Sequence, residues 1–209
     1  MTISGPRDVK WILASASPRR SEILSSLGLH FRVEPSGIPE PDCIRGRQPS
    51  RCAADLARAK ALDVARKHRS GVVIGADTVV YAGKRILGKP AHEDEAREML
   101  RRLSGRWHEV ITGLFLYDCG TGRGAAAHAL SRVHFRRLSR ENLDWYISTG
   151  EYRDKAGAYA IQGYASLFVD RIEGCYFNIV GFPVSVFYLL CRRLDLPLLR
   201  RLRRTTAQP

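Results

Sequence analysis

Two serines and two arginines gather at the predicted start of a helix near the N-terminus. The apolar segment Trp11–Ala14 predicts a short strand, which runs into Ser15-Ala16-Ser17-Pro18-Arg19-Arg20. Ser17 suits the N-cap position and Pro18 the first helical position. Arginines in a first turn are unfavourable beside the positive end of the helix dipole, unless an anion neutralises them. The hydroxyls of Ser15 and Ser17, the backbone N–H groups and the side chains of Arg19 and Arg20 therefore indicate a phosphate site. The alternative is two solvated arginines after an ordinary cap.

An aspartate lies inside a nearly continuous apolar run. The residues from Val72 to Val80 read Val-Val-Ile-Gly-Ala-Asp-Thr-Val-Val, a composition typical of a strand buried on both faces. We expect this strand to be interrupted in its middle, and Gly75 and Ala76 to leave room for a large group. A buried carboxylate is costly unless it is paired or binds a metal, so Asp77 is a candidate metal ligand or general base. The alternative is a turn residue between two shorter strands.

A lysine lies on the apolar face of a predicted helix that begins at Pro49 and ends near His68. Lys60 is four residues from both Leu56 and Val64, which belong to the apolar stripe, so its side chain points along that stripe. Either its ammonium group extends to solvent, or it reaches into a cleft to meet an anion.

Two further charged residues lie in loops stiffened by proline. Lys89, in Leu87-Gly88-Lys89-Pro90, is by itself typical of an exposed loop lysine. Glu40 stands between Pro39 and Pro41, which restrict the backbone on both sides of it. A carboxylate fixed in this way is a candidate to share a divalent cation with Asp77.

A stretch of small residues follows in the second half of the chain. It reads Asp-Lys-Ala-Gly-Ala-Tyr-Ala-Ile-Gln-Gly from Asp154 to Gly163. Small side chains let the backbone approach a ligand closely. Gln162 carries both donor and acceptor groups, which suit the edge of a nucleobase. A local ion pair between Asp154 and Lys155, with no role in chemistry, is the alternative.

The elements that must position these side chains alternate between strands and helices, which predicts an α/β fold. The predicted strands are Trp11–Ala14, His30–Val33, Val72–Tyr81, Arg85–Leu87, Glu109–Tyr117, Ala126–Leu138, Ser166–Ile172 and Tyr176–Val180, the last two paired across Glu173-Gly174. The predicted helices are Pro18–Leu27, Pro49 to about His68, His92–Leu103, the segment from Ser139 to Gly150, and Pro183–Leu194. We expect one domain over residues 1–209, with flexible tails at 1–9 and 196–209.

Composition limits the class of protein. The chain has 209 residues, of which 44% are apolar, enough for a core. No apolar run reaches the roughly 18 residues of a membrane span, and the start of the chain lacks the apolar core of a secretion signal. We therefore expect a soluble cytoplasmic protein without a membrane partner, in which most of the five cysteines are thiols. The net charge of +13 permits an anionic partner. The basic tail Arg192–Arg204 contains no interleaved aromatic residues, so nucleic acid is not indicated.

Together, these segments resemble the Maf family of nucleotide pyrophosphatases from about residue 12 to residue 183. The shared motifs occur in one order: Leu13–Arg20, Gly75–Val80, Gly88-Lys89-Pro90, Ser104-Gly105 with His108, Val110, Thr112 and Gly113, Asp154–Gly163, and Asn178–Pro183. The resemblance implies a mixed twisted α/β sheet with flanking helices, in two lobes around a central cleft, as in the inosine-triphosphate pyrophosphatase superfamily. It also implies hydrolysis of a nucleoside triphosphate to the monophosphate and pyrophosphate, with Mg²⁺ or Mn²⁺ as cofactor.

The resemblance also implies residue roles. The stretch Asp154–Gly163 looks like the branch that acts on dTTP and UTP, whereas a sister branch prefers methylated guanine nucleotides. By the family pattern, Asp77 is the proton acceptor. Base preference is assigned to Arg19, Thr78 and Gln162, and the phosphate and metal region to Ser15, Arg20, Glu40, Lys60, Lys89 and Lys155. The chain departs from the pattern at Tyr152, at Phe182 and at Tyr164-Ala165-Ser166, and the last departure lies beside Gln162.

The expected partner is thus a small nucleoside triphosphate, and a homodimer is one option for assembly. Two other functions stay open on the sequence alone. One is a nucleotide- or DNA-binding regulator of cell division without catalysis. The other is a pyrophosphatase for methylated purine or modified pyrimidine nucleotides. Release of pyrophosphate from dTTP distinguishes the enzyme from the regulator, and a panel of substrates distinguishes it from the other pyrophosphatase.

Overall fold

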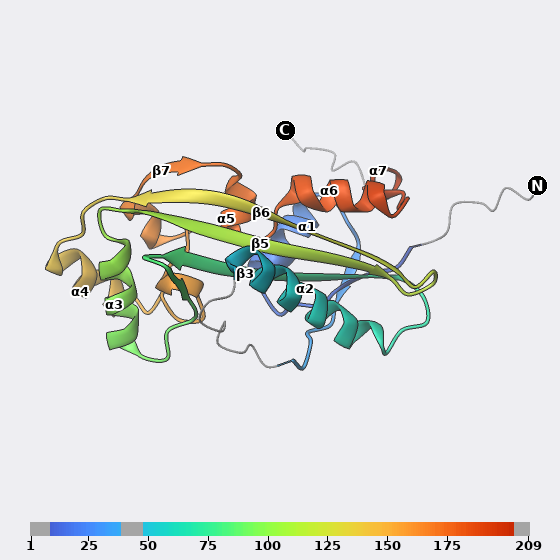
Figure 1. Ribbon diagram of the computed structural model, residues 1–209, viewed down its shortest axis with the longest axis horizontal. Helices are drawn as coiled ribbons and strands as arrows, with labels where there is room; N and C mark the ends of the chain where they lie inside the picture. The colour runs from blue at the N-terminus through green and yellow to red at the C-terminus, as the bar shows by residue number, and fades with distance from the viewer. Residues whose placement is uncertain (1–8, 39–47, 203–209) are drawn as a thin grey trace, which may run out of the picture.

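A seven-stranded mixed sheet forms the centre of the computed structural model, which describes residues 9–38 and 48–202 (Figure 1). The strand order is β2-β1-β3-β5-β6-β7, and β4 pairs with β3. The strands are β1 (Trp11–Leu13), β2 (Phe31–Val33), β3 (Val72–Ala82), β4 (Arg85–Leu87), β5 (Trp107–Asp118), β6 (Arg123–Phe135) and β7 (Val169–Glu173). β1 is parallel to β2 and β3, and the other pairs are antiparallel. The mixed sheet with flanking helices confirms the predicted α/β class.

Helices cover both faces of the sheet. Helix α2 (Pro49–Ala65) lies on one face, whereas α1 (Pro18–Ser26), α5 (Tyr176–Val180) and α6 (Val184–Arg193) lie on the other (Figure 1). Helices α3 (Glu93–Leu103) and α4 (Arg140–Ser148) pack at one end, together with the 3₁₀ helices η1 (Ala156–Ala158) and η2 (Tyr164–Phe168). Helix α7 (Leu198–Arg201) follows α6. Within the predicted C-terminal tail, Leu198 is buried.

Strand β3 presents alternate side chains to the two faces. Val73 packs in the cluster that contains Ala57, Ala61 and Val64 of α2, whereas Ile74 packs in the larger cluster on the other face. Because strand side chains alternate, Asp77 faces α2 and Thr78 faces α1 and α5. The predicted interruption is wrong: β3 pairs with β5 from Val72 to Tyr81 without a break. Because this pairing continues through Asp77, the residue lies within the strand and is not a turn residue.

Glycines let α2 lie unusually close to the sheet. A Cβ atom at Gly75 would lie 2.0 Å from the carbonyl oxygen of Ala57, and one at Gly113 would lie 2.4 Å from that of Ala53. Gly113 is also the register partner of Asp77 on β5. The space beside Gly75 is therefore filled by the backbone of α2. This close packing brings the helix within reach of the aspartate.

One predicted strand is a helix. Tyr176–Val180 forms α5, and β7 ends at Glu173 without pairing to it. Gly181 ends α5 in the left-handed conformation, with φ 115°, a common helix C-cap that glycine adopts at little cost. A five-residue segment with four apolar residues, Tyr176–Val180, fits a buried strand or a buried helix equally well by pattern, so the pattern alone misassigned it.

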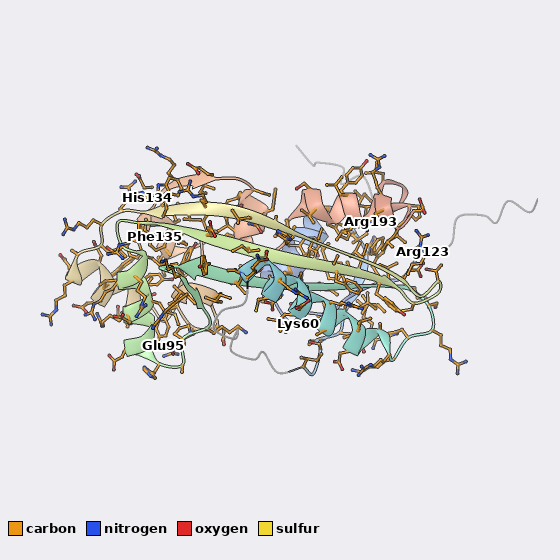
Figure 2. The ribbon with its side chains drawn as sticks, viewed as in Figure 1. Lys60, Glu95, Arg123, His134, Phe135 and Arg193 are labelled. Atoms are coloured by element: carbon orange, nitrogen blue, oxygen red, sulfur yellow. The ribbon has the colours of Figure 1, made fainter. Side chains whose placement is uncertain are left out.

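The tip of the β5–β6 hairpin lies against the end of α6, where Arg123 donates to the carbonyl of Arg193 at 3.4 Å (Figure 2).

Cys119, Cys175 and Cys191 are free thiols as expected, whereas Cys52 is disulfide-bonded. In the described parts of the chain, each helix is too short or too polar to cross a bilayer.

Candidate active site

The edge of β3 that faces away from β5 is open in its middle. Since β5 pairs along one edge, β1 and β4 must share the other edge. β1 pairs only as far as Ile74, and β4 begins to pair at Val80. Among residues 9–38 and 48–202, no strand covers the segment between these points. Ile74 accepts from Ala14 on this edge, so the alternating backbone groups of Ala76 and Thr78 point there too and are placed to bond a ligand.

A cleft of about 1570 Å³ opens at this gap. Because the gap interrupts the sheet, side chains from both faces reach the same cavity. The predicted site residues that line it are Ser15, Ser17, Arg19, Arg20, Lys60, Asp77, Thr78, Lys89 and Lys155. Glu40 lies outside the described residues. Gln162 is exposed and is not among the described lining residues, although its neighbour Ile161 is.

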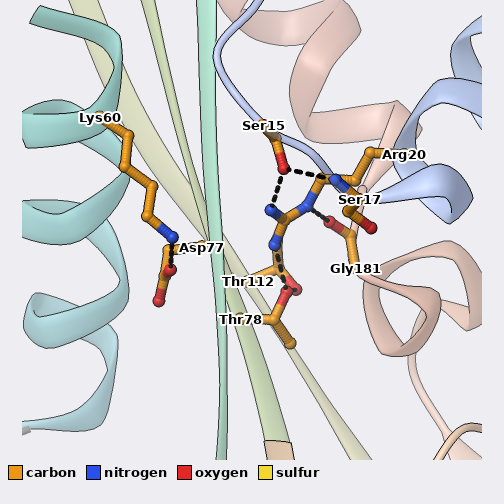
Figure 3. A network of polar contacts seen from close by, with 8 residues as sticks. All are labelled: Ser15, Ser17, Arg20, Lys60, Asp77, Thr78, Thr112 and Gly181. Carbon is orange, nitrogen blue, oxygen red and sulfur yellow. Dashed lines mark hydrogen bonds and ion pairs between the residues drawn. The ribbon is translucent and has the colours of Figure 1, made fainter. Parts of the chain in front are cut away.

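A buried ion pair occupies the α2 face of the site. The Lys60 Nζ atom donates to the Asp77 Oδ1 atom at 2.6 Å (Figure 3). Only 7% of the lysine side chain and 9% of the aspartate side chain are exposed. Lys60 therefore does not extend its ammonium group to solvent. The group points along the apolar stripe toward β3. The attraction between these charges is stronger than in water because both are largely shielded from solvent.

A buried arginine occupies the opposite face. The Arg20 guanidinium group donates to the carbonyl of Gly181 at 3.0 Å, to the Ser15 hydroxyl at 2.8 Å and to the Thr78 hydroxyl at 3.2 Å (Figure 3). Three acceptors from three separate segments thus fix the planar group. The Ser15 hydroxyl also accepts from the Ser17 N–H at 3.3 Å. Ser17 is the N-cap residue of α1, but its side chain makes no capping hydrogen bond.

Asp77 and Arg20 point away from each other across β3. Figure 3 shows Lys60 and Asp77 on one side of the strand, and Arg20, Ser15 and Thr78 on the other. Their separation follows from the alternation of Asp77 and Thr78 along the strand. The two groups still line one cavity, since the open edge connects the faces. A ligand in this cleft would therefore pass over the edge of β3, with the carboxylate on one side and the guanidinium group on the other.

Three further cations lie near one another in the cleft. Burial lowers the pKa of Arg19, against the opposing effect of the carboxylates of Glu22 and Glu151. Burial also lowers the pKa of Lys155, and the charges of Arg19 and Lys89 lower it further. These cations repel one another, so the site favours an anion that neutralises all of them. This arrangement is what polyphosphate binding requires.

Backbone contacts join the segments that carry Lys89 and Lys155. The N–H of Gly157 donates to the carbonyl of Gly88 at 2.9 Å. Gly157 has φ 69°, and a Cβ atom there would lie 3.0 Å from Val80. Glycine is therefore required for both the conformation and the close packing. The bond places the two lysines at the same side of the cleft.

A buried histidine anchors the far end of the Lys155 segment. His108 on β5 is 2% exposed, and its Nε2 atom lies 2.8 Å from the hydroxyl of Tyr159, the residue that follows η1. Burial lowers the pKa of His108 to about 4, although a hydrogen bond with the backbone of Arg106 opposes the shift. The histidine is thus neutral in the folded protein at neutral pH.

This shift predicts a loss of stability in mild acid. The folded-state pKa of about 4 lies below the ordinary value of about 6.5, so the unfolded chain binds a proton that the folded chain does not. The contribution of His108 to the free energy of unfolding is therefore fully present above about pH 6.5. It falls as the pH drops toward 4, by about 2 kcal/mol between pH 7 and pH 5. Urea unfolding of the wild type and of His108→Gln at both pH values measures this. Between pH 7 and pH 5, the free energy of unfolding of the variant should fall by about 2 kcal/mol less than that of the wild type. Equal losses in the two proteins would contradict the lowered pKa of His108.

Sequence reasoning missed a carboxylate that shapes the turn after Gln162. Glu151 accepts from the Tyr146 hydroxyl at 3.1 Å, and from the N–H groups of Tyr164 at 2.8 Å and Ala165 at 3.1 Å. The turn that departs from the family pattern is thus held by one carboxylate at the start of η2. No local sequence signal marks this role, because Glu151 lies 13 residues before Tyr164.

The described residues fit a metal only in part. They contain no group of three or more His, Cys, Asp and Glu side chains that could enclose an ion. Asp77 offers carboxylate oxygens in the cleft. Mg²⁺ commonly binds through one or two carboxylates while substrate phosphates and water supply the other ligands. A single aspartate beside a polyphosphate site is compatible with that mode.

The chain is similar to known proteins over most of its length. The family model described as Maf-like protein matches residues 10–194. A dTTP/UTP pyrophosphatase of Desulforamulus reducens is 47% identical over 174 residues, which cover 83% of this chain and 91% of the relative. A dTTP/UTP pyrophosphatase of Aquifex aeolicus is 45% identical over 185 residues, which cover 88% of this chain and 95% of the relative.

Among solved structures, the chain is similar to a nucleoside-triphosphatase / dITP/XTP pyrophosphatase of Mycobacterium abscessus. The identity is 13% and the TM-score 0.38, with 62% of this chain and 76% of that chain covered. The family model spans most of the chain, and the curated relatives match over most of their own length. The chain therefore belongs to the Maf-like protein family.

Proposed function

We propose that this protein is a nucleoside triphosphate pyrophosphatase that hydrolyses dTTP and UTP to the monophosphate and pyrophosphate. The observation that carries the proposal is one cleft at the open edge of β3 that is lined both by a buried carboxylate, on the α2 face, and by a set of cations. The relatives named dTTP/UTP pyrophosphatase support the choice of substrate.

The proposed reaction is attack of water on the α-phosphorus. A bond forms between the water oxygen and that phosphorus, the α–β phosphoanhydride bond breaks, and pyrophosphate leaves. Asp77 orients the water and accepts its proton, a role worth about 10²- to 10⁴-fold in rate. Lys60 holds the Asp77 carboxylate in place through their 2.6 Å contact.

The cations of the cleft bind the triphosphate in this proposal. Arg20 presents a planar group whose orientation three protein acceptors fix. Arg19, Lys89 and Lys155 add charges that neutralise the repulsion between the phosphate oxygens and the attacking water. Positioning and charge neutralisation supply most of the catalysis in phosphoryl transfer.

A divalent cation, Mg²⁺ or Mn²⁺, is part of the proposal. Asp77 and Glu40 would hold it, and it would act as a Lewis acid on phosphate oxygens. We also propose that Arg19, Thr78 and Gln162 set the preference for the base. Gln162 lies outside the lining of the cleft, so its turn would have to move inward to meet a base. A cytoplasmic location suits an enzyme of nucleotide pools.

A panel of nucleotides tests the proposal. Pyrophosphate release is measured with dTTP, UTP, dCTP, dATP, GTP and 7-methyl-GTP, each with Mg²⁺, with Mn²⁺ and with EDTA. We expect turnover of dTTP and UTP that exceeds that of the purine nucleotides at least tenfold, and complete loss with EDTA. Preference for 7-methyl-GTP would favour the methylated-purine alternative. Binding of nucleotides with no pyrophosphate release under any metal would favour the regulator instead.

A further inference from the structure

A closed ring of hydrogen bonds holds Arg20 from two sides. On one side, Arg20 Nε donates to the Gly181 carbonyl, and the Gly181 N–H donates to the Asn178 carbonyl at 3.0 Å. On the other side, Arg20 donates to the Thr78 hydroxyl, which lies 2.9 Å from the Thr112 hydroxyl. The Thr112 hydroxyl donates to the same Asn178 carbonyl at 2.9 Å. Both chains of hydrogen bonds that begin at the guanidinium group therefore end at the carbonyl oxygen of Asn178.

The direction of each proton in this ring is determined. A carbonyl oxygen can only accept, so the single hydroxyl proton of Thr112 points to Asn178. Thr78 must then donate its own proton to Thr112, and this leaves its lone pairs directed at Arg20. The acceptor that Arg20 meets on β3 therefore depends on a threonine that does not touch the arginine.

Asn178 anchors the ring to the sheet. Its Oδ1 atom accepts from the Thr112 N–H at 3.0 Å, and its Nδ2 atom donates to the Val110 carbonyl and the Ser131 hydroxyl, each at 2.9 Å. Thr112 and Asn178 are both 0% exposed. Buried polar groups are costly unless they are bonded, so the bonds of Asn178 to Thr112 and Val110 on β5 fix α5 and Gly181 against that strand.

We propose that Thr112 and Asn178 are positioning residues that orient Arg20 for polyphosphate binding. The inference rests on the proposed function, in which Arg20 binds the phosphates of the substrate. Neither residue is among the described residues that line the cleft. Both act by fixing the two acceptors, the Thr78 hydroxyl and the Gly181 carbonyl, that hold the guanidinium group in its plane.

Thr112→Val tests the ring with little change in packing, because valine has nearly the shape of threonine. Asn178 keeps the Gly181 N–H as a donor to its carbonyl, whereas Thr78 loses its acceptor. Thr112→Ser restores the hydroxyl. Ser131→Ala is the matched control, since it removes a buried hydroxyl bonded to Asn178 on the side away from Arg20. Urea unfolding of each variant measures the purely structural cost.

Binding of inorganic tripolyphosphate, measured by calorimetry in Mg²⁺ buffer, is the main readout, and kcat/KM for dTTP is the second. We expect Thr112→Val to weaken tripolyphosphate binding and lower kcat/KM at least tenfold, and Thr112→Ser and Ser131→Ala to stay within threefold of the wild type. Wild-type binding by Thr112→Val, an equal loss in Ser131→Ala, or no binding by the wild type would overturn the inference. The predicted binding pattern without turnover of dTTP would refute the proposed function but not the positioning role.

Discussion

Asp77→Asn is expected to lower kcat for dTTP by about 10²- to 10⁴-fold while nucleotide binding survives. Asparagine has the size of aspartate and can still accept from Lys60, but it cannot take a proton from water. The arginine and the lysines that bind phosphates in the proposal lie on the other side of β3 or in other loops. Pyrophosphate release and the Kd of a non-hydrolysable dTTP analogue measure the two effects separately. Near-normal turnover would remove Asp77 from the chemistry.

The same variant changes a buried ion pair, and its structural effect has to be separated from its chemical effect. Removing the charge of Asp77 from its 2.6 Å contact with the 7%-exposed Lys60 side chain costs stability, about 3–5 kcal/mol when one partner of a buried pair is lost. The double variant Lys60→Met with Asp77→Asn removes both charges, so it should recover part of that stability in urea unfolding. It should not recover turnover. Recovery of turnover together with stability would make the role of Asp77 structural.

The sequence could predict β3 and its aspartate because both signals are local. A long apolar run specifies a buried strand, and a single charge within it stands out against that pattern. The same reasoning predicted the helix that carries Lys60. It could not predict that Asp77 and Arg20 point to opposite faces, because this depends on which neighbours pair with β3 and where they stop. The open edge between Ile74 and Val80 is set by the lengths of β1 and β4, which no local pattern specifies.

The residues that hold the site together were the hardest to predict. Asn178 bonds to Thr112, which lies 66 positions earlier in the chain, and only the folded sheet brings them together. The segment around Asn178 was predicted as a strand, and a strand would have placed its side chain elsewhere. A signal did exist at Thr112, a polar residue inside the apolar run of β5, similar to Asp77 in β3. Its buried contacts with Asn178 depend on the fold, so the residue type alone does not specify them.

Arg20→Lys is expected to lower kcat/KM for dTTP at least about 10²-fold, although the charge is kept. A lysine ammonium group is a compact charge without the planar fork of a guanidinium group, so it cannot meet Ser15, Thr78 and Gly181 together. A displaced ammonium group would also lose two of the hydrogen bonds that the oriented guanidinium group donates to the phosphates in the proposal. Hydrogen bonds to charged groups contribute about 1.5–3 kcal/mol each, which gives this magnitude. Steady-state kinetics with dTTP measures the loss.

A second arginine provides the control for this substitution. Arg132 is exposed, pairs with Glu173 at 2.7 Å and lies over the ring of Trp107, outside the lining of the cleft. Arg132→Lys should therefore leave kcat/KM within about twofold of the wild type, since surface ion pairs contribute at most about 1 kcal/mol and do so to stability. If Arg20→Lys also stays within that range, a positive charge at this position is sufficient. The fixed orientation of the guanidinium group would then have no part in phosphate binding, and Arg20 would act only through its charge, as Arg19, Lys89 and Lys155 do in the proposal.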